Sequence, residues 1–358
     1  MTQGGRGGVV GAFTEWDPLE EVIVGSLTGA VVPSWQEAMR ATMPESSWQL
    51  FMESGGEPFD KGHVSRAEEE LDGLVSVLED HGVRVRRPAV LDHSQPFSTP
   101  EWSVDGGLYA GMPRDGILLI GDTVIEAPMS WRCRYHEATA FRSLIREYFS
   151  GGARWAPAPQ PVLDDSLYVP DSDGWAVNES EPVFDAADFM KFGADLVVQR
   201  SHVTNEAGIR WVQKTLGPDI RVHQVTVNDP HAMHIDATLL PLASGKLLVN
   251  PERFVHDPLF DGWEIKAAPP GTTPPEWPMY FCSPWVSMNL LSIDPETVVV
   301  EENEGPLIDL LTEWGFRCLR LPFRHVYSLG GSFHCVTIDV RRRGPLATYL
   351  RAEPTGDM

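Results

Sequence analysis

Five times along the chain, a helix-like stretch ends at a glycine and a short strand-like segment follows. In the clearest case the apolar residues Leu71, Leu74 and Leu78 recur at helical spacing, and Gly82 then ends the stretch. The segment VRVR follows, with the alternation typical of a strand. Similar junctions lie near residues 152, 217, 262 and 315. The pattern predicts an α/β fold built from small helix-and-strand units.

Helix starts and additional strands complete this prediction. Ser65 and Glu68 have capping-box spacing, and Thr204 or Asn205 is expected to cap the helical stretch that ends near residue 217. Further apolar strands are predicted at 117–121, 195–199, 246–250 and 297–302. Five repeats of two or three strands with one helix account for the pattern. A common α/β sheet protein, whose helix-to-strand turns also favour glycine, remains the alternative from pattern alone.

Composition excludes several classes of protein. Lys and Arg number 28 against 51 Asp and Glu, which gives a net charge of −23, and such a surface repels nucleic acid and anionic lipid. The short basic run Arg341–Arg343 is interpreted as a solvated strand end. The four cysteines lack the spacing of a disulfide framework or a zinc site. No apolar run has the length of a signal peptide or a membrane span. We therefore expect a cytoplasmic protein that binds neither nucleic acid nor membrane.

The chain length and the glycine content near the N-terminus predict the domain organisation. We expect a glycine-rich flexible tail over residues 1–12 and a single catalytic domain over residues 13–358. Two proline-rich segments, 156–182 and 267–278, are expected to be long surface loops within that domain.

Three strings carry side chains suited to chemistry. Gly330 and Gly331 lie just before Cys335, so a thiol could lie at a cleft, although a buried strand cysteine is the alternative. If the segment after His231 is extended, His234 and Asp236 share one face, as an acid/base pair, a metal site or a satisfied core pair would.

The third string, FDAAD at 184–188, could bury Asp185 against a histidine, and the alternative is a helix cap. Together the three strings supply a thiol, an imidazole and a carboxylate, which are the parts of a nucleophilic site. The sequence nominates no third metal ligand cleanly, so we expect no metal.

Ordered blocks along nearly the whole chain resemble the amidinotransferase family. The blocks include EWDPLEEVIVG (15–25), PRDGILLIGDTVIEAPMSWRCRY (113–135), PVFDAADFMKFG (182–193), MHIDATLLPL (233–242), NPER (250–253) and SLGGSFHCVTIDVRRRG (328–344). The resemblance implies a five-bladed α/β propeller with pseudo-fivefold symmetry. It also implies ping-pong transfer of the amidino group of L-arginine to an amine, without metal or cofactor.

The resemblance also implies the roles of individual residues. Cys335 matches the nucleophile, His234 the general acid/base and Asp185 the carboxylate that orients it. The positions implied to bind substrate are Asp115, Asp236, Arg253, Cys282, Ser283, Met233 and His231. His231, Ala232, Cys282 and Ser332 depart from the family pattern, and His231 is expected near the acceptor.

The acceptor and the partners are less constrained. Glycine is the acceptor we expect, which would make ornithine and guanidinoacetate the products, and an inosamine phosphate or a secondary-metabolite precursor is the alternative. A deiminase that hydrolyses arginine on the same fold, and a non-catalytic arginine-binding protein, are further alternatives. The expected partners are small-molecule substrates, and a homodimer is left open.

Overall fold

The computed structural model describes residues 8–169 and 174–351, and within them the strands form five three-stranded sheets. In each sheet the middle strand pairs antiparallel with one neighbour and parallel with the other. The sheets are β17–β1–β2, β5–β6–β7, β8–β9–β10, β11–β12–β13 and β14–β15–β16. This repeated topology is a five-bladed α/β propeller, so the five-unit prediction is confirmed and the common α/β sheet is wrong.

The strands are short, and most lie where the sequence predicts them. Their bounds are β1 Leu19–Val24, β2 Arg84–Arg86, β5 Ile117–Ile120, β6 Thr123–Glu126, β7 Arg154–Pro157, β8 Phe189–Phe192, β9 Asp195–Gln199, β10 Arg221–Val225, β11 Leu239–Ala243, β12 Lys246–Val249, β13 Glu264–Ala267, β14 Leu291–Asp294, β15 Thr297–Glu301, β16 Arg317–Leu321 and β17 Thr337–Arg342. A separate hairpin joins β3 (Phe97–Ser98) to β4 (Ser103–Val104).

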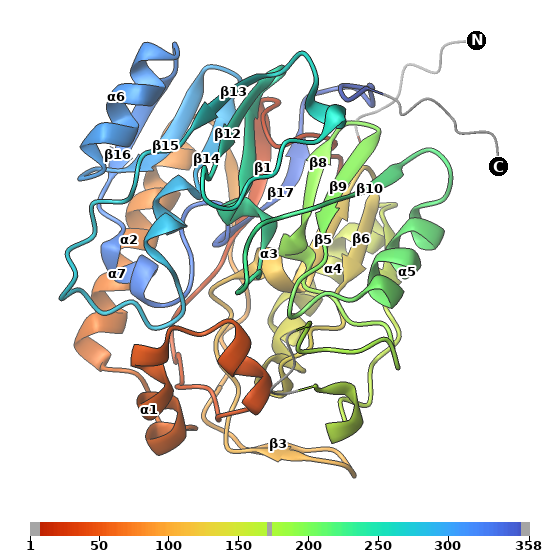
Figure 1. The fold of residues 1–358 in the computed structure, drawn as a ribbon, viewed down its shortest axis with the longest axis vertical. Coiled ribbons are helices and arrows are strands. Elements are labelled where there is room, and N and C mark those ends of the chain that lie inside the picture. The colour runs from red at the N-terminus through yellow and green to blue at the C-terminus, as the bar shows by residue number, and fades with distance from the viewer. Residues whose placement is uncertain (1–7, 170–173, 352–358) are drawn as a thin grey trace.

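A helical connection precedes the third strand of each blade. It is α2 (Lys61–Asp80), α4 (Arg142–Ser150), α5 (Glu206–Leu216) or α6 (Gly305–Glu313) in four blades, and only the 3-10 turn η7 (Pro258–Phe260) in the blade of β11–β13. Figure 1 shows α2, α5 and α6 on the outside of the sheets. Each connection ends at a glycine with positive φ, because only glycine takes this conformation without steric strain; these are Gly82, Gly152, Gly217, Gly262 and Gly315.

The first blade closes the ring. The last strand, β17, pairs antiparallel with the first, β1, so segments more than 300 residues apart lie in one sheet. In the same blade the apolar stripe of α2, formed by Ala67, Leu71, Leu74 and Leu78, is fully buried. This burial of one helical face against the sheet is what the sequence spacing predicts.

The start of α2 differs from the prediction. The helix begins at Lys61 and is capped by Asp60, whose carboxylate accepts a hydrogen bond from the backbone N–H of His63 at 2.8 Å. Ser65 therefore lies inside the helix, and the predicted capping box is wrong. Glu68 instead accepts hydrogen bonds from the N–H groups of Leu27 and Thr28, a tertiary contact that competes with local capping.

Two predictions near the termini also need correction. Residues 1–7 lie outside the described residues, but Val10 and Ala12 are buried and Gly11 donates to the carbonyl of Val340, so the expected tail does not extend to residue 12. Arg342 is not part of a solvated strand end, because its side chain is buried and its Nε lies 3.1 Å from Asp339.

The remaining helical segments are ten residues long or shorter. They are α1 (Glu45–Ser54), α3 (Pro113–Gly116), α7 (Arg324–Ser328) and the 3-10 turns η1 (Glu37–Ala41), η2 (Arg132–Arg134), η3 (Glu137–Phe141), η4 (Asp165–Leu167), η5 (Ala186–Asp188), η6 (Ile235–Ala237) and η8 (Pro284–Met288). None of the described helices has the length and hydropathy needed to cross a membrane.

Candidate active site

Four of the predicted site residues, together with the unpredicted Asn289, lie at equivalent positions of the five blades. Each blade has one strand that pairs only antiparallel, namely β5, β8, β11, β14 or β17, and a short turn precedes it. These turns carry Asp115, Asp185, Asp236, Asn289 and Cys335. Because the turns pack against one another, residues separated by up to 220 positions converge at one place.

A cavity of about 690 Å³ opens over these turns. Of the predicted residues, its lining includes Asp115, His231, Met233, His234, Asp236, Arg253, Cys282, Ser283 and Cys335. Asp185 is absent from the lining and lies behind His234. One wall comes from residues 40–48, and another comes from residues 273–284, which begin within the proline-rich segment 267–278.

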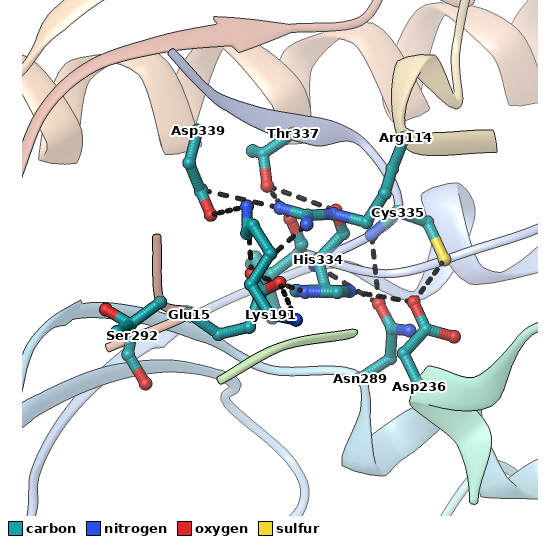
Figure 2. Close-up of polar contacts among 12 residues, drawn as sticks. Glu15, Arg114, Lys191, Asp236, Asn289, Ser292, His334, Cys335, Thr337 and Asp339 are labelled. Carbon is teal, nitrogen blue, oxygen red and sulfur yellow. Dashed lines mark hydrogen bonds and ion pairs between the residues drawn. The ribbon is translucent and has the colours of Figure 1, made fainter. Parts of the chain in front are cut away.

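The thiol of Cys335 lies on this lining with 4 % of the residue exposed. Its Sγ lies 3.5 Å from Oδ2 of Asp236 (Figure 2). Gly331 leaves the space for it, since a Cβ there would approach the Cβ of Cys335 to 2.5 Å. Gly330 has φ of 118°, and a Cβ on it would lie 2.6 Å from the hydroxyl of Tyr109. Both glycines are therefore required by the shape of the loop that presents the sulfur.

His234 lies between two carboxylates. Its Nε2 is 3.0 Å from Oδ2 of Asp185, and its Nδ1 is 3.6 Å from Oδ1 of Asp115. The segment is not the extended strand that we expected: His234 has φ of 62° and precedes η6, and β11 begins only at Leu239. Positive φ is unfavourable for a residue other than glycine, so this backbone is strained. The pairing of the His234 ring with two carboxylates holds the strained backbone in place.

Asp185 does not act as a helix cap. It precedes η5, but its side chain makes no capping hydrogen bond and pairs with His234 instead. The backbone N–H of Asp185 donates to Oγ1 of Thr204, which in turn donates to Asp188. The predicted burial of an acid against a histidine is therefore what the structure shows.

A buried arginine that the sequence analysis missed joins the acids. Arg134 donates from Nε and Nη2 to the carboxylate of Glu137 at 2.7 and 2.6 Å, and from Nη1 to Asp115 at 2.9 Å. Its Nη1 is also 3.8 Å from Asp185. This pairing disperses the negative charge of three buried carboxylates. Arg134 lies in the block SWRCRY, but spacing alone gives no sign that its side chain is buried.

Burial and nearby carboxylates have opposite effects on the pKa of His234 and the same effect on the pKa of Cys335. Burial alone would lower the pKa of His234, but Asp115 and Asp185 outweigh it and raise that pKa to about 10. Burial, together with the carboxylates of Asp236 and Asp115, raises the pKa of the Cys335 thiol well above its ordinary value. The protein groups alone thus favour an imidazolium and a neutral thiol, and a cation bound between the carboxylates would favour the thiolate.

The remaining predicted residues line a second part of the same cavity. Nε of Arg253 lies 3.1 Å from Asp229, and its Nη2 donates to Oγ of Ser283 at 3.2 Å. Burial raises the pKa of the Cys282 thiol above its ordinary range. His231 is exposed at the edge, and its Nδ1 lies 2.7 Å from the carbonyl oxygen of Ala41 on the opposite wall.

Two further residues shape the site without having been predicted. The amide oxygen of Asn289 accepts hydrogen bonds from the backbone N–H groups of His334 and Cys335, both at 3.1 Å. His334, the neighbour of the thiol, bonds to Asp236 through Nδ1 at 2.8 Å. The motif GGSFHC contains His334, so adjacency to the cysteine was a usable signal. Among the described residues no group of three or more His, Cys, Asp or Glu side chains is arranged to hold a metal ion.

This five-bladed propeller, with a thiol, a His–Asp pair and converging carboxylates, defines an enzyme that acts on guanidino compounds. No family model matches the chain. It is 46% identical to the L-arginine:L-lysine amidinotransferase of Pseudomonas savastanoi pv. phaseolicola, over 95% of this chain and 96% of that protein. It is 42% identical to the mitochondrial glycine amidinotransferase of Xenopus laevis, over 95% of this chain and 84% of that protein.

Solved structures agree with these sequence relatives. SxtG, an amidinotransferase from Microseira wollei in the saxitoxin biosynthetic pathway, has a TM-score of 0.90 at 43% identity, over 95% of this chain and 99% of that one. Inosamine-phosphate amidinotransferase StrB1 from Streptomyces griseus has a TM-score of 0.89 at 38% identity, over 96% and 99%. A dimethylarginine dimethylaminohydrolase shares the fold at 14% identity, with a TM-score of 0.58. The chain belongs to the amidinotransferase family, and it is an amidinotransferase enzyme.

Proposed function

We propose that this amidinotransferase takes the amidino group of L-arginine onto Cys335 and passes it to the amine of an amino acid. The observation that carries the proposal is the convergence of a thiol, a His–Asp pair and two carboxylates on one cavity. A guanidinium is planar and cationic, so carboxylates can grip it and hold its carbon against sulfur. Oδ1 of Asp115 is buried without a hydrogen-bond partner and supplies one such acceptor, and Asp236 beside the thiol supplies the other.

The first half-reaction follows from this arrangement. The arginine cation favours loss of the Cys335 thiol proton to solvent, and the thiolate attacks the guanidinium carbon. The bond from that carbon to the side-chain nitrogen breaks as His234 gives that nitrogen a proton, which releases ornithine and leaves amidino-cysteine. A pKa of about 10 keeps His234 protonated for this step at neutral pH. In the second half, an acceptor amine attacks the same carbon, returns a proton to His234 and expels the thiolate.

An amino-acid acceptor could use the same binding position as the arginine donor. Ornithine must leave before the acceptor enters, so both amines use the same position beside Cys335. Arg253 is the cation that would hold the carboxylate of arginine, and the carboxylate of an incoming amino acid can take the same place. Lysine matches ornithine except for one added methylene, whereas in glycine a single carbon separates the amine from the carboxylate. We therefore favour a diamino acid such as lysine over the glycine that we first expected.

Glycine stays the second candidate acceptor, because relatives named glycine amidinotransferases are 41–42% identical over 95% of the chain. An inosamine phosphate is a third, from the 38% identical streptomycete enzyme.

The test of the proposed function has two parts. Arginine alone should add one amidino group to Cys335, detected by peptide mass, and Cys335→Ala should add none. A screen of lysine, glycine and a phosphorylated aminocyclitol then reads ornithine and the guanidino product.

Two results would contradict the proposal. Label on Cys133, Cys282 or Cys318 would remove Cys335 from the nucleophile role. Citrulline release at the same rate with and without any amine would mean that water resolves the intermediate, as in a hydrolase.

A further inference from the structure

A buried ionic network lies next to the cavity-lining residues Asp236 and Cys335 (Figure 2). Asp339 of β17 pairs with Nζ of Lys191 at 3.1 Å and with Nη2 of Arg114 at 3.4 Å. Glu15 pairs with the same two cations, at 3.5 and 3.2 Å. These four side chains are at most 7 % exposed, so the network does not reach solvent. His334 links it to the cavity-lining carboxylate of Asp236.

His334 is held on every polar atom. Its Nδ1 lies 2.8 Å from Oδ2 of Asp236, and its Nε2 lies 3.3 Å from Oε2 of Glu15. Its backbone N–H donates to Asn289, and its carbonyl accepts from Nε of Arg114 at 2.7 Å. The side chain is 3 % exposed. The ring therefore cannot turn without breaking contacts with two carboxylates.

The two partners of the ring are both acceptors. Burial alone would raise the pKa of Glu15, but Lys191 and Arg114 outweigh it and lower that pKa to about 2. Burial would likewise raise the pKa of Asp236, and the hydrogen bond from His334 is the largest influence that lowers it. A neutral imidazole would aim a nitrogen lone pair at one of these anions, whereas an imidazolium donates to both.

We propose that His334 is a positioning residue, an imidazolium that fixes Asp236 beside the Cys335 sulfur and keeps its carboxylate ionised for the guanidinium. The same oxygen of Asp236, Oδ2, faces Nδ1 of His334 and Sγ of Cys335, so the ring sets where that oxygen lies relative to the thiol. The inference rests on the proposed function, in which Asp236 binds arginine. It can be tested separately from that function, because it concerns the protonation of His334, which does not line the cavity.

The surrounding charges indicate how loss of the His334 charge would change proton binding by Asp236. The titratable and charged groups that face Asp236 and His334 are Glu15, Arg114, Lys191, Asp339, Asp115, His234, Cys282 and Cys335. The cations beneath are already paired with Glu15 and Asp339. Loss of the His334 charge therefore removes the hydrogen-bonded cation of Asp236, and that carboxylate should bind protons more readily.

The first test is the pH dependence of kcat/KM for arginine in His334→Gln. The acidic limb should move to higher pH by about 1–3 units, and the KM for arginine should rise about tenfold, with a smaller change in kcat. The matched control is His223→Gln. Nε2 of His223 also contacts a carboxylate, that of Asp195 at 2.8 Å, but Asp195 does not line the cavity as Asp236 does. Its acidic limb should match that of the wild type. An unmoved limb in a folded His334→Gln protein overturns the proposal.

The second test uses the unaltered protein. After labelling of histidine with ¹⁵N, both ring nitrogens of His334 should carry protons near neutral pH, with or without arginine. The signal is assigned by its loss in His334→Gln or, should that variant not fold, by its displacement in Asp236→Asn. A ring nitrogen without a proton overturns the proposal. Failure of wild-type protein to form amidino-Cys335 would instead refute the proposed function, and the ring measurement distinguishes the two failures.

Discussion

Replacement of Asp185 by asparagine tests how the charge on His234 is maintained. The carboxylate lies 3.0 Å from Nε2 of His234 and is buried, so the pair is poorly screened by water. Despite the opposing effect of burial, the carboxylates raise the pKa of His234 from 6.5 to about 10. That rise corresponds to roughly 5 kcal/mol in favour of the imidazolium, and Asp185 shares it with Asp115.

Asparagine keeps the size of the side chain and removes its charge. One close carboxylate contributes about 1–3 pKa units, so the pKa of His234 should fall into the range of roughly 7–9. His234 is then protonated only at lower pH, so the alkaline limb of the arginine half-reaction should move to lower pH. The rate should also fall by about 10²–10⁴, because the amide no longer stabilises the imidazolium or fixes its orientation.

The assay is formation of amidino-Cys335 in a single turnover, followed by quenched-flow mass spectrometry across pH. Circular dichroism and arginine binding by calorimetry serve as controls, and both should be close to wild type. An alkaline limb at its original pH, with a rate within about threefold of wild type, would refute the assignment of Asp185 as the partner that sets the charge on His234.

Four further predictions concern binding, selectivity, backbone and stability. Asp236→Asn should weaken arginine binding about 10- to 100-fold by calorimetry, and unchanged affinity would remove Asp236 from the guanidinium site. His231→Asn should change the relative rates with glycine and lysine while amidino-Cys335 forms at a nearly constant rate; a donor step as slow as that of Asp185→Asn would place His231 in the donor chemistry. Gly330→Ala should lower kcat/KM by at least about tenfold, because φ of 118° and the nearby Tyr109 hydroxyl exclude a Cβ, and full activity would contradict that. Since the folded protein holds the His234 proton up to pH about 10, urea melts should show stability present below pH 6.5 and declining between those values; a wild-type stability that rises over this range, or a decline just as large in His234→Gln, would exclude that contribution.

The local chemistry of the chain was sufficient to predict its repeating units. The five junction glycines all have positive φ, which is a steric property of one residue and its neighbours. Likewise, the spacing of Leu71, Leu74 and Leu78 fixes which face of α2 is buried, whatever lies opposite it. These features depend on residues within one or two turns of each other, so the sequence alone determines them. The resemblance of whole blocks then indicated five blades, which the periodicity had left open.

Only the tertiary structure decided how the site is completed. Glu68 has the spacing of a capping residue, yet it accepts hydrogen bonds from a loop 40 residues away. His234 lies in a segment with strand-like composition, yet its pairing with Asp185, 49 residues away, accompanies a positive φ. Arg134 and His334 also pair with carboxylates that other blades supply, Asp185 and Asp236 respectively. A buried charge must find its counter-charge wherever the fold brings one near, and no local pattern encodes which carboxylate that is.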